Sequence, residues 1–413
     1  MHFNKRCTAA IFVISALSFA LFGCSDTENL SPEYESGFVE TEFSSEFTEE
    51  FSEYYENEET ETESETEPEH SLLSEAISFS GRYIYKDDIH WLVQSGSTAG
   101  FSVTGTKASV TIAGDTSVYS ENDLRPRYAV YLDGETVREG LIESPEESIV
   151  LFDEDYSRTA EVRIILLSEA KYGGIGIKDI DIKGTGEEHI APLEQKELFI
   201  EFIGDSITCG FGTDADEGSE PFSTATENFC KSYAYIAAQE LDADCSAVAY
   251  SGYGVISGYS SGEKNSEETV PAYYDIASRY SGYDEKWDFS ERKTDVVFIN
   301  LGTNDTCYVS RDDEYTCEEF KEGYKALLNT VREKNPDAVI ICTVGLMGGE
   351  LTIYPLIEQA VSEFGDEKVS CFLSPYQDIE NNGAGACWHP SEKTQYDYGL
   401  LAAEKIREAI ADN

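Results

Sequence analysis

The sequence predicts a multi-domain protein in which an N-terminal β-sandwich precedes a three-layer α/β/α domain built on a parallel sheet. The chain of 413 residues is too long for one average domain. Residues 72–187 contain short alternating apolar runs between turn signals, which is typical of a β-sandwich. Within residues 188–413, apolar strand runs alternate with helical patterns, which indicates a doubly wound parallel sheet.

The first 24 residues have the pattern of an export signal. Lys5 and Arg6 give a positive start, an apolar run extends to Phe22, and Gly23-Cys24 closes it. A run this short that ends in a small residue favours a cleaved signal over a spanning helix. Leu-Phe-Gly-Cys resembles the bacterial lipobox, which implies that Cys24 is lipidated and becomes the new N-terminus. The alternative is an ordinary secretory signal with a chance Cys.

Residues 25–71 form an acidic segment rich in Glu, Ser, Thr and Tyr, with no Lys or Arg. Like charges repel and little apolar surface can be buried, so we expect an extended, solvated spacer. About 45 extended residues would reach on the order of 150 Å, enough to lift a domain through a cell wall. The alternative for its scattered aromatic residues, such as Phe43, Phe47 and Phe51, is a docking strip.

The chain as a whole is strongly acidic, with 81 acidic and 29 basic residues and a formal net charge of −52. Phosphate binding needs a basic face, so this charge argues against a nucleic-acid partner. A neutral polysaccharide would not be repelled. After the signal, no apolar stretch is long enough to span a bilayer.

Eight cysteines follow Cys24, and none of them forms a Cys-x-x-Cys pair. A zinc site is therefore not indicated, and we expect no metal. Export permits disulfides, but eight cysteines allow on the order of a hundred full pairings, and the sequence does not choose among them.

In the β domain, five runs are expected to form strands, and Asp133-Gly134 is a strong hairpin-turn signal. These runs are Arg82–Tyr85, Phe101–Val103, Ser109–Ile112, Tyr128–Leu132 and Glu161–Leu167. In the second domain we expect parallel strands at Leu198–Ile203, Ala247–Ala249, Asp295–Leu301, Ala338–Val344 and Lys368–Leu373. Helices are expected at Thr226–Leu241, Glu318–Lys334 and Gln395–Asp412.

Ligands of such sheets bind at the carboxyl ends of the strands, so the residues after each strand are the candidates for chemistry. Four segments meet this condition or lie near the chain end: Gly204-Asp205-Ser206-Ile207-Thr208, Ser251-Gly252-Tyr253-Gly254, Gly302-Thr303-Asn304-Asp305 and Trp388-His389-Pro390.

These four segments resemble the SGNH (GDSL-type) hydrolase superfamily in order, spacing and content, over about residues 195–413. The longer stretch from Gly204 to Gly212, with the preceding β domain, resembles carbohydrate esterase family two. That family joins a small jelly-roll domain to an SGNH domain and removes acetyl groups from plant polysaccharides. The resemblance implies a jelly roll at 72–187 and an SGNH hydrolase domain at 188–413.

Ser206 is the candidate nucleophile. A serine hydroxyl needs an adjacent base, and the turn from strand to helix would expose this one. The alternative is that Ser206 only caps the helix. The base is then His389, because it alone of five histidines lies inside the α/β domain, where the superfamily keeps its base just before the closing helix. The others are His2 in the signal, His70 in the acidic segment, His90 in the β domain and His189 in the connector between the domains. A solvent-facing loop histidine is the alternative for His389.

The resemblance implies three donors for the transition-state oxyanion: the backbone N–H of Ser206, the backbone N–H of Gly252 and the side-chain amide of Asn304. Gly254 competes with Gly252, and either could be an ordinary turn glycine. Asn304 could instead be a turn residue.

One position departs from the superfamily pattern. The Asp usually found three residues before the histidine is replaced here by Ala386. Family two tolerates this with a Ser–His dyad in which a backbone carbonyl orients the imidazole, and we expect the carbonyl of Trp388 to do so. Asp378 or Asp397 could instead supply a carboxylate to His389.

The ring of Trp388 could stack on a sugar face, or pack in the core. Asp205 and Asp305 are expected to hold the active-site loops by hydrogen bonds. Cys209, Cys307 and Cys387 lie near three of the segments and could pair or merely pack.

These observations predict a serine esterase that deacetylates O-acetylated xylan or glucomannan by acyl transfer, without a cofactor. We expect a monomer that is exported and lipid-anchored on the extracellular face of the membrane, or secreted. Two alternatives stay open: a non-catalytic, cell-surface carbohydrate-binding lipoprotein, and an esterase for another acyl ester such as peptidoglycan O-acetyl.

Overall fold

The computed structural model describes residues 72–184, 186 and 188–412. The predicted signal at 1–24, its Cys24 and the predicted spacer at 25–71 lie outside the described residues. By contacts the chain divides into residues 1–65 and 66–413, and every element below belongs to the second unit.

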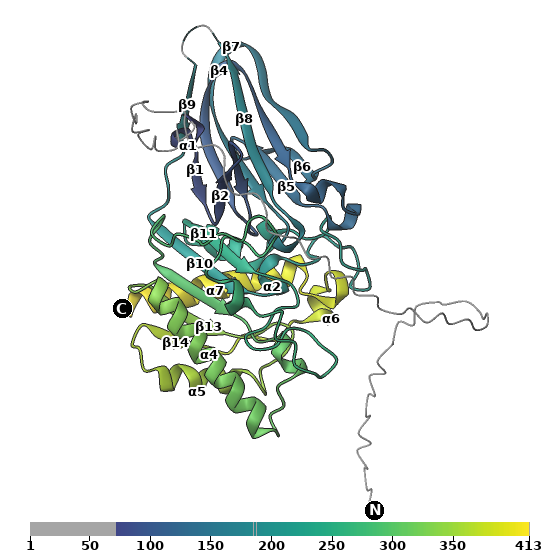
Figure 1. Cartoon of the computed structure of the whole chain (residues 1–413), viewed down its shortest axis with the longest axis vertical. Helices are drawn as coiled ribbons and strands as arrows, with labels where there is room; N and C mark the ends of the chain where they lie inside the picture. The colour runs from purple at the N-terminus through teal and green to yellow at the C-terminus, as the bar shows by residue number, and fades with distance from the viewer. Residues whose placement is uncertain (1–71, 185, 187, 413) are drawn as a thin grey trace, which may run out of the picture. The chain divides into compact units, whose positions relative to one another are not determined.

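The β domain is one nine-stranded antiparallel sheet in the order β2-β3-β8-β4-β7-β5-β6, with β1 and β9 also pairing with β4 (Figure 1). Its elements are α1 (Leu72–Ala76), β1 (Ser78–Ser80), β2 (Tyr83–Lys86), β3 (Ile89–Leu92), β4 (Thr98–Gly114), β5 (Arg127–Leu132), β6 (Glu135–Leu141), β7 (Glu146–Leu166), β8 (Ile175–Lys183) and β9 (His189–Pro192). The sheet curls because the long pair β4–β7 shifts register between Gly105 and Lys107 and again between Ala108 and Ser109.

The interior of the curled sheet is built by alternation. Phe101, Val103, Val110 and Ile112 of β4 are fully buried and pack in one apolar cluster. The two strands predicted at 101–103 and 109–112 are thus parts of one 17-residue strand, because the irregularity between them bends the chain without ending the pairing. The predicted hairpin turn at Asp133-Gly134 joins β5 and β6, with φ of 50° and 85°.

The α/β domain is a five-stranded, all-parallel sheet in the order β11-β10-β12-β13-β14. Its strands are β10 (Leu198–Gly204), β11 (Ala243–Ala249), β12 (Val296–Asn300), β13 (Val339–Thr343) and β14 (Val369–Cys371). Its helices are α2 (Ser206–Cys209), α3 (Tyr233–Glu240), α4 (Glu314–Lys334), α5 (Tyr354–Phe364), α6 (Ile379–Asn382) and α7 (Glu392–Ala411).

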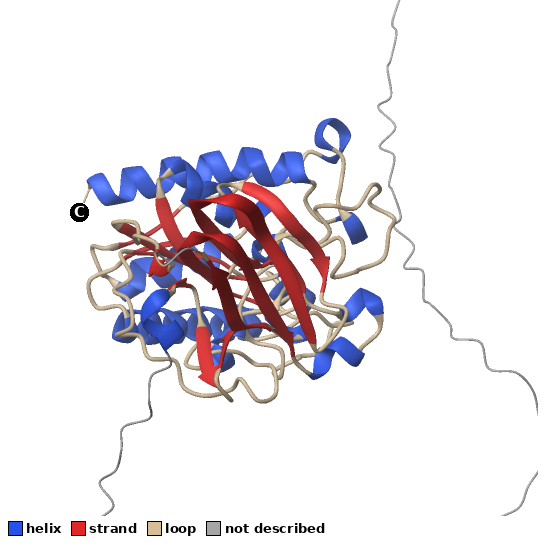
Figure 2. Cartoon of the chain, turned by 90° about the horizontal axis from the view of Figure 1, so that it is seen from above, coloured by secondary structure: helices blue, strands red, loops and turns tan. Residues whose placement is uncertain are grey.

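Helices cover both faces of the parallel sheet, which makes the three layers (Figure 2). One apolar cluster joins the sheet to α4 and α5 through side chains such as Phe320 and Ile357. A second cluster joins it to α3 and α7 through Ala237 and Ala402. Strand β10 lies between β11 and β12, so the strand order of the sheet reverses at β10. Sheets of this type bind ligands at the carboxyl ends of the strands where the order reverses.

All three predicted helices begin elsewhere than predicted. The helix predicted from Gln395 begins at Glu392, after its cap Ser391. The helix predicted from Thr226 begins at Tyr233, because Asn228 caps a separate 3-10 turn and Ser232 then caps α3. The helix predicted from Glu318 begins at Glu314, where the side chain of Asp313 accepts the N–H of Tyr315.

Within the part of the chain that is described, no helix has the length and apolar character needed to cross a membrane.

A buried arginine ties the β domain to the α/β domain. Arg82 is fully buried and donates to the carbonyls of Tyr274 and Ile276 at 2.5 and 2.6 Å. It also pairs with Glu201 of β10 at 3.1 Å. The second carboxylate oxygen of Glu201 accepts the Tyr274 hydroxyl at 2.6 Å, so the carboxylate is held by both domains.

Replacing Arg82 with Met is expected to lower the free energy of unfolding by about 3–5 kcal/mol, because it leaves the Glu201 carboxylate buried without its partner. Chemical denaturation measures the change. The matched control is Lys107→Met, whose pair with Asp153 is more than half exposed and should contribute less than about 1 kcal/mol. Equal effects of the two variants would contradict this account of the Arg82 contact.

Candidate active site

The first candidate residue, Ser206, lies in a tight turn between β10 and α2. The side chain of Asp205 caps α2 by accepting the N–H of Ile207 at 3.0 Å. The turn requires glycine at 204, because a Cβ there would lie 2.0 Å from the Thr208 hydroxyl. Ser206 is therefore the first residue of its helix, where a backbone N–H has no intrahelical acceptor.

His389 reaches the serine hydroxyl from the other end of the domain. Its Nε2 lies 2.9 Å from Ser206 Oγ, and its Nδ1 lies 3.2 Å from the carbonyl oxygen of Ala386. The imidazole also stacks on Phe211, with ring centroids 4.0 Å apart. The sequence-predicted nucleophile and base are thus in direct contact.

The carbonyl that faces the imidazole is not the one predicted. The carbonyl of Trp388 accepts the side-chain amide of Gln377 at 3.0 Å, so the expectation that it orients His389 was wrong. The reason is the conformation of Cys387 and Trp388, whose φ values of 49° and 62° are both left-handed. This tight curl turns the carbonyl of Ala386, three residues before the histidine, back toward the ring.

Such a turn is unfavourable for non-glycine residues and needs support from its surroundings. The loop at 212–220 supplies it through three backbone hydrogen bonds. The N–H groups of Ala386, Cys387 and Trp388 donate to the carbonyls of Gly212, Glu220 and Gly218 at 3.1, 2.9 and 3.0 Å. This turn thus occupies the position at which the superfamily pattern that the sequence resembles has an Asp.

Neither alternative carboxylate contacts His389. Asp378 caps α6 and accepts from Asn381, and Asp397 pairs with Lys393 on α7. The Nδ1 atom of His389 faces the backbone carbonyl of Ala386 instead.

The surroundings keep the imidazole neutral. Burial lowers the pKa of His389 to about 4, and the backbone carbonyls of Ala386 and Cys387 offset only part of this effect. A neutral imidazole at pH 7 can accept the proton of the Ser206 hydroxyl.

We therefore expect kcat/KM for an aryl acetate to fall only below about pH 4 to 5, not near the ordinary imidazole pKa of 6.5. Because the pKa is lower in the folded state, the contribution of His389 to stability is lost as the pH falls from 6.5 toward 4. Values of kcat/KM measured across the pH range test the first prediction, and chemical denaturation across the same range tests the second. Burial raises the pKa of the neighbouring Asp205 to about 7, and Asp205→Asn should leave the acid limb in place. A limb near pH 6.5 would contradict the prediction.

The three loops that carry the predicted oxyanion donors begin next to one another, after strand residues that pair in register. Gly204 pairs in register with Ala249 on one side and Asn300 on the other, so the segments after β10, β11 and β12 leave the same sheet edge. The side-chain amide of Asn304 donates to the carbonyl of Tyr253 at 2.8 Å, and the same nitrogen makes a long contact of 3.5 Å with the carboxylate of Asp205.

The structure separates Gly252 from its competitor. The N–H of Gly254 already donates to the carbonyl of Glu268 at 3.1 Å, and a Cβ at 254 would lie 2.0 Å from the carbonyl oxygen of Ser257. Gly252 has φ 85°, and within the described residues no hydrogen bond of its N–H is found. The geometry therefore favours Gly252 as the available donor, while Gly254 serves the fold.

Asp305 holds the neighbouring loop. It accepts the backbone N–H groups of Val255, Ile256 and Ser257 at 2.8–3.0 Å. Burial raises the pKa of its carboxyl to about 7 against the effect of these donors. Asp205 and Asp305 each hold backbone, and among the described contacts neither touches the reacting Oγ or imidazole.

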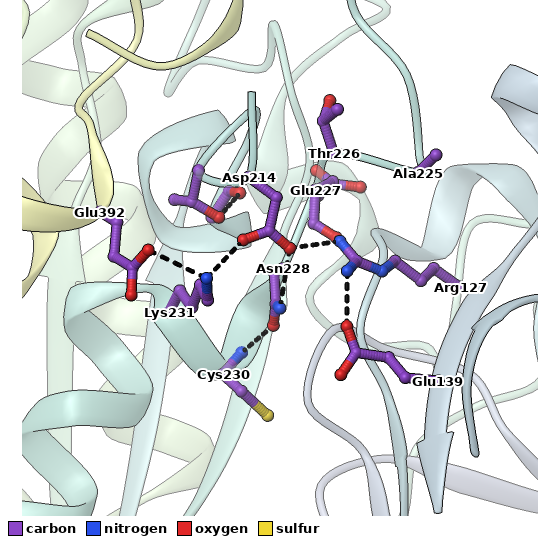
Figure 3. A network of polar contacts seen from close by, with 12 residues as sticks. Arg127, Glu139, Asp214, Ala225, Thr226, Glu227, Asn228, Cys230, Lys231 and Glu392 are labelled. Atoms are coloured by element: carbon purple, nitrogen blue, oxygen red, sulfur yellow. Dashed lines mark hydrogen bonds and ion pairs between the residues drawn. The ribbon is translucent and has the colours of Figure 1, made fainter. Parts of the chain in front are cut away.

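A charge network braces the loop that follows α2 (Figure 3). Asp214 accepts Arg127 of the β domain at 2.6 Å, Lys231 at 2.7 Å and Asn228 at 3.1 Å. Lys231 continues to Glu392, at the start of α7 and three residues after His389. Burial raises the pKa of Asp214, but these three donors outweigh it and lower the pKa.

Two aromatic residues that adjoin candidate site residues are exposed. Trp388 is 57% exposed, which contradicts core packing, and with Tyr396 and Ile379 it lines a groove of 910 Å³ that does not include Ser206. Tyr259 is 69% exposed, and its N–H donates to the carbonyl of Gly252 at 2.7 Å. The sequence does not single out Tyr259, because Tyr259 follows no predicted strand. Phe211 is not singled out either, although it lies within the Gly204 to Gly212 stretch that carries the family resemblance.

All eight cysteines after Cys24 are free thiols; Cys209 is buried, Cys307 half-buried and Cys387 exposed. Of the described residues, no group of three or more His, Cys, Asp or Glu is placed to hold a metal ion.

Comparison with known proteins assigns both domains. Residues 202–392 match the GDSL-like lipase/acylhydrolase family, and residues 79–192 match the carbohydrate esterase 2 N-terminal domain. The chain is 33% identical over 353 residues to cellulase/esterase CelE of Acetivibrio thermocellus, across 81% of this chain and 39% of that protein. It is 25% identical over 247 residues to an acetylxylan esterase / glucomannan deacetylase of Cellvibrio japonicus, across 59% and 66%. The chain thus spans less than two thirds of the length of these curated relatives.

Solved structures agree. A family two carbohydrate esterase from Clostridium thermocellum, in complex with cellohexaose, has a TM-score of 0.69 at 29% identity, over 82% of this chain and 100% of that one. The acetyl xylan esterase Est2A from the rumen bacterium Butyrivibrio proteoclasticus shares the fold, with a TM-score of 0.71 at 22% identity over 82% and 97%. The chain thus contains a GDSL-like lipase/acylhydrolase domain, preceded by a carbohydrate esterase 2 N-terminal domain.

Proposed function

We propose that this protein is a serine esterase that removes acetyl groups from O-acetylated plant polysaccharide such as xylan or glucomannan. The 2.9 Å contact between His389 Nε2 and Ser206 Oγ carries the proposal, because it unites a nucleophile and a neutral base at the switch point of the sheet. The esterases among its relatives support the reaction class.

The reaction proceeds by acyl transfer through an acetyl-enzyme. Ser206 Oγ attacks the acetyl carbonyl carbon while His389 Nε2 takes the hydroxyl proton. The ester bond to the sugar oxygen then breaks, and His389 returns the proton to that oxygen. Water attacks the acetyl-Ser206, again giving its proton to His389, and acetate leaves as Ser206 is reprotonated.

Charge develops on the acetyl oxygen in each tetrahedral step. The N–H groups of Ser206 and Gly252 and the amide of Asn304 would stabilise it without reorganisation. The carbonyl of Ala386 holds the Nδ1 proton, so Nε2 is the basic nitrogen that faces Ser206.

The polysaccharide assignment is supported by Trp388 and Tyr259. Both rings are exposed, and flat apolar faces of this kind can stack on sugar rings. A solved relative was obtained in complex with cellohexaose.

The substrate assignment is tested by acetate release from acetylated xylan, acetylated glucomannan and O-acetylated peptidoglycan at equal ester concentration. We expect release from one or both plant polysaccharides at least tenfold faster than from peptidoglycan. Faster release from peptidoglycan would overturn the substrate class while leaving the esterase assignment intact.

We further propose that the chain is exported and anchored by a lipid on Cys24 at the extracellular face of the membrane. The support is the signal pattern in the sequence. Expressed in a bacterial host, the full chain should partition with detergent, and Cys24→Ser should shift it to the aqueous phase. Aqueous partitioning of both forms would favour plain secretion.

A further inference from the structure

A loop of the β domain lies against the turn that carries Gly252. This loop joins β7 to β8, and its residues Glu169 and Lys171 both contact Ser251 in the α/β domain. The N–H of Ser251 donates to the Glu169 carboxylate at 2.8 Å, and the Lys171 ammonium donates to the carbonyl oxygen of Ser251 at 3.0 Å. Both backbone polar groups of Ser251 are therefore held by the other domain.

The carbonyl of Ser251 and the N–H of Gly252 belong to the same peptide unit. The unit is planar and trans, so its carbonyl and its N–H point in opposite directions. A group that fixes the carbonyl from one side also fixes the direction of the N–H on the other. Glycine has little intrinsic preference for one orientation, so without such a contact the N–H of Gly252 would be poorly aimed.

The Lys171 contact also changes the strength of this donor. A cation bound to an amide oxygen draws electron density from the amide nitrogen, which makes the N–H more acidic and a better donor. The effect is larger here because Ser251 is buried, where the surrounding dielectric is low.

The loop itself is firmly placed. Glu169 is fully buried, and its own N–H donates to the carboxylate of Glu227 at 2.8 Å. Burial and the nearby Glu169 raise the pKa of Glu227 well above its usual range. Leu167, two residues earlier, accepts the N–H of Phe229 at 2.9 Å.

We infer that Lys171 is a positioning residue that aims and polarises the Gly252 N–H, so that the N-terminal domain completes the oxyanion site of the α/β domain. The inference rests on the proposed function. It gives the β domain a part in the chemical step, in addition to any contact that it makes with glycan.

The test uses the complete enzyme and p-nitrophenyl acetate. Lys171→Met keeps the length of the side chain and removes its charge and its donors. We expect kcat to fall by about ten- to a hundredfold, the range that a small misplacement of a catalytic group can cause, with KM changed less than about twofold. Lys171→Arg, which can still donate to the carbonyl, should recover most of kcat.

The matched control is Lys178→Met, a lysine of the same domain that lies on β8 and pairs with Glu146 at the surface. It should keep wild-type kcat and KM. Equal thermal midpoints for the two methionine variants would show that the loss at 171 is not general unfolding. If Lys171→Met does not fold, Lys171→Gln carries the same comparison, with a smaller fall because a neutral donor is kept.

A spectroscopic measurement reports on the peptide itself. In ¹⁵N-glycine-labelled protein, the Gly252 amide resonance should move in Lys171→Met and return in Lys171→Arg. An unchanged Gly252 resonance, kcat within twofold of the Lys178→Met control, or a rise in KM alone would each overturn the inference. A folded wild-type enzyme with no esterase activity would overturn the proposed function instead.

Discussion

Replacing Ser206 with Ala is expected to lower kcat for p-nitrophenyl acetate by on the order of 10⁵- to 10⁶-fold, to the level that binding and the oxyanion donors alone sustain. The variant removes the atom that becomes acylated, so the acetyl-enzyme cannot form. Ser206 is 7% exposed and its hydroxyl contacts the imidazole, so the loss of one oxygen should leave the fold intact. Initial rates with p-nitrophenyl acetate measure the fall.

The matched control is Ser261→Ala, an exposed serine of a loop that contacts neither member of the dyad, and it should retain full activity. Intact-mass spectrometry after rapid acid quench adds a direct test, because wild type should carry an acetyl group and Ser206→Ala should not. A Ser206→Ala enzyme with more than about 1% of wild-type kcat would sink the assignment, and no esterase activity in either would favour a carbohydrate-binding protein.

His389 and Ser206 should behave as one unit. His389→Ala is expected to cost about as much as Ser206→Ala, and the double variant should be no slower than either single variant, because each removes the same step. Additive losses would show that another base activates Ser206.

The sequence was sufficient for the dyad because both residues are tied to local patterns. Ser206 follows an apolar strand and begins a helix, and His389 lies two residues before Ser391, the cap of the closing helix. Parallel strands place their carboxyl ends at one edge, so residues far apart in sequence could be expected to meet there. The observed sheet, β11-β10-β12-β13-β14, is parallel throughout, as this expectation requires.

The carbonyl that orients His389 could not be predicted in the same way. Its identity depends on two non-glycine residues, Cys387 and Trp388, in left-handed conformations that single residues of these types rarely adopt. The surrounding loop at 212–220 imposes this turn through long-range hydrogen bonds. Local propensity favours an ordinary turn, and for such a turn the nearest carbonyl, that of Trp388, is the expected partner of the His389 imidazole.

The contacts of Lys171 and Glu169 with Ser251 were also beyond sequence reasoning. They link residues 80 and 82 positions apart, and they join two domains whose patterns give no sign of contact. Their loop has no motif of its own. Only the packing of the β domain against the sheet edge shows that the Gly252 turn is held from outside its own domain.

Replacing Asn304 with Ala is expected to lower kcat for the same ester by about 100- to 1000-fold with little change in KM, because the amide should contact the substrate oxygen only once charge develops there. Asn304→Asp, which has the same shape but loses the N–H donor, should be at least as slow. The matched control is Asn329→Ala on α4, which removes an amide that bonds only within its own helix.

Asn304 also holds the carbonyl of Tyr253, so a loss of activity has a second physical explanation that must be separated from the first. If the amide acted only by bracing that loop, its removal would displace Gly252 as well, and both Asn304→Ala and Lys171→Met would then weaken the same donor. Their effects on kcat would not add. If Asn304 instead donates to the oxyanion itself, the two variants remove different contributions and their effects should multiply in the double variant. Less than multiplicative loss would therefore reassign Asn304 from oxyanion donor to loop support, even if the single variant is slow.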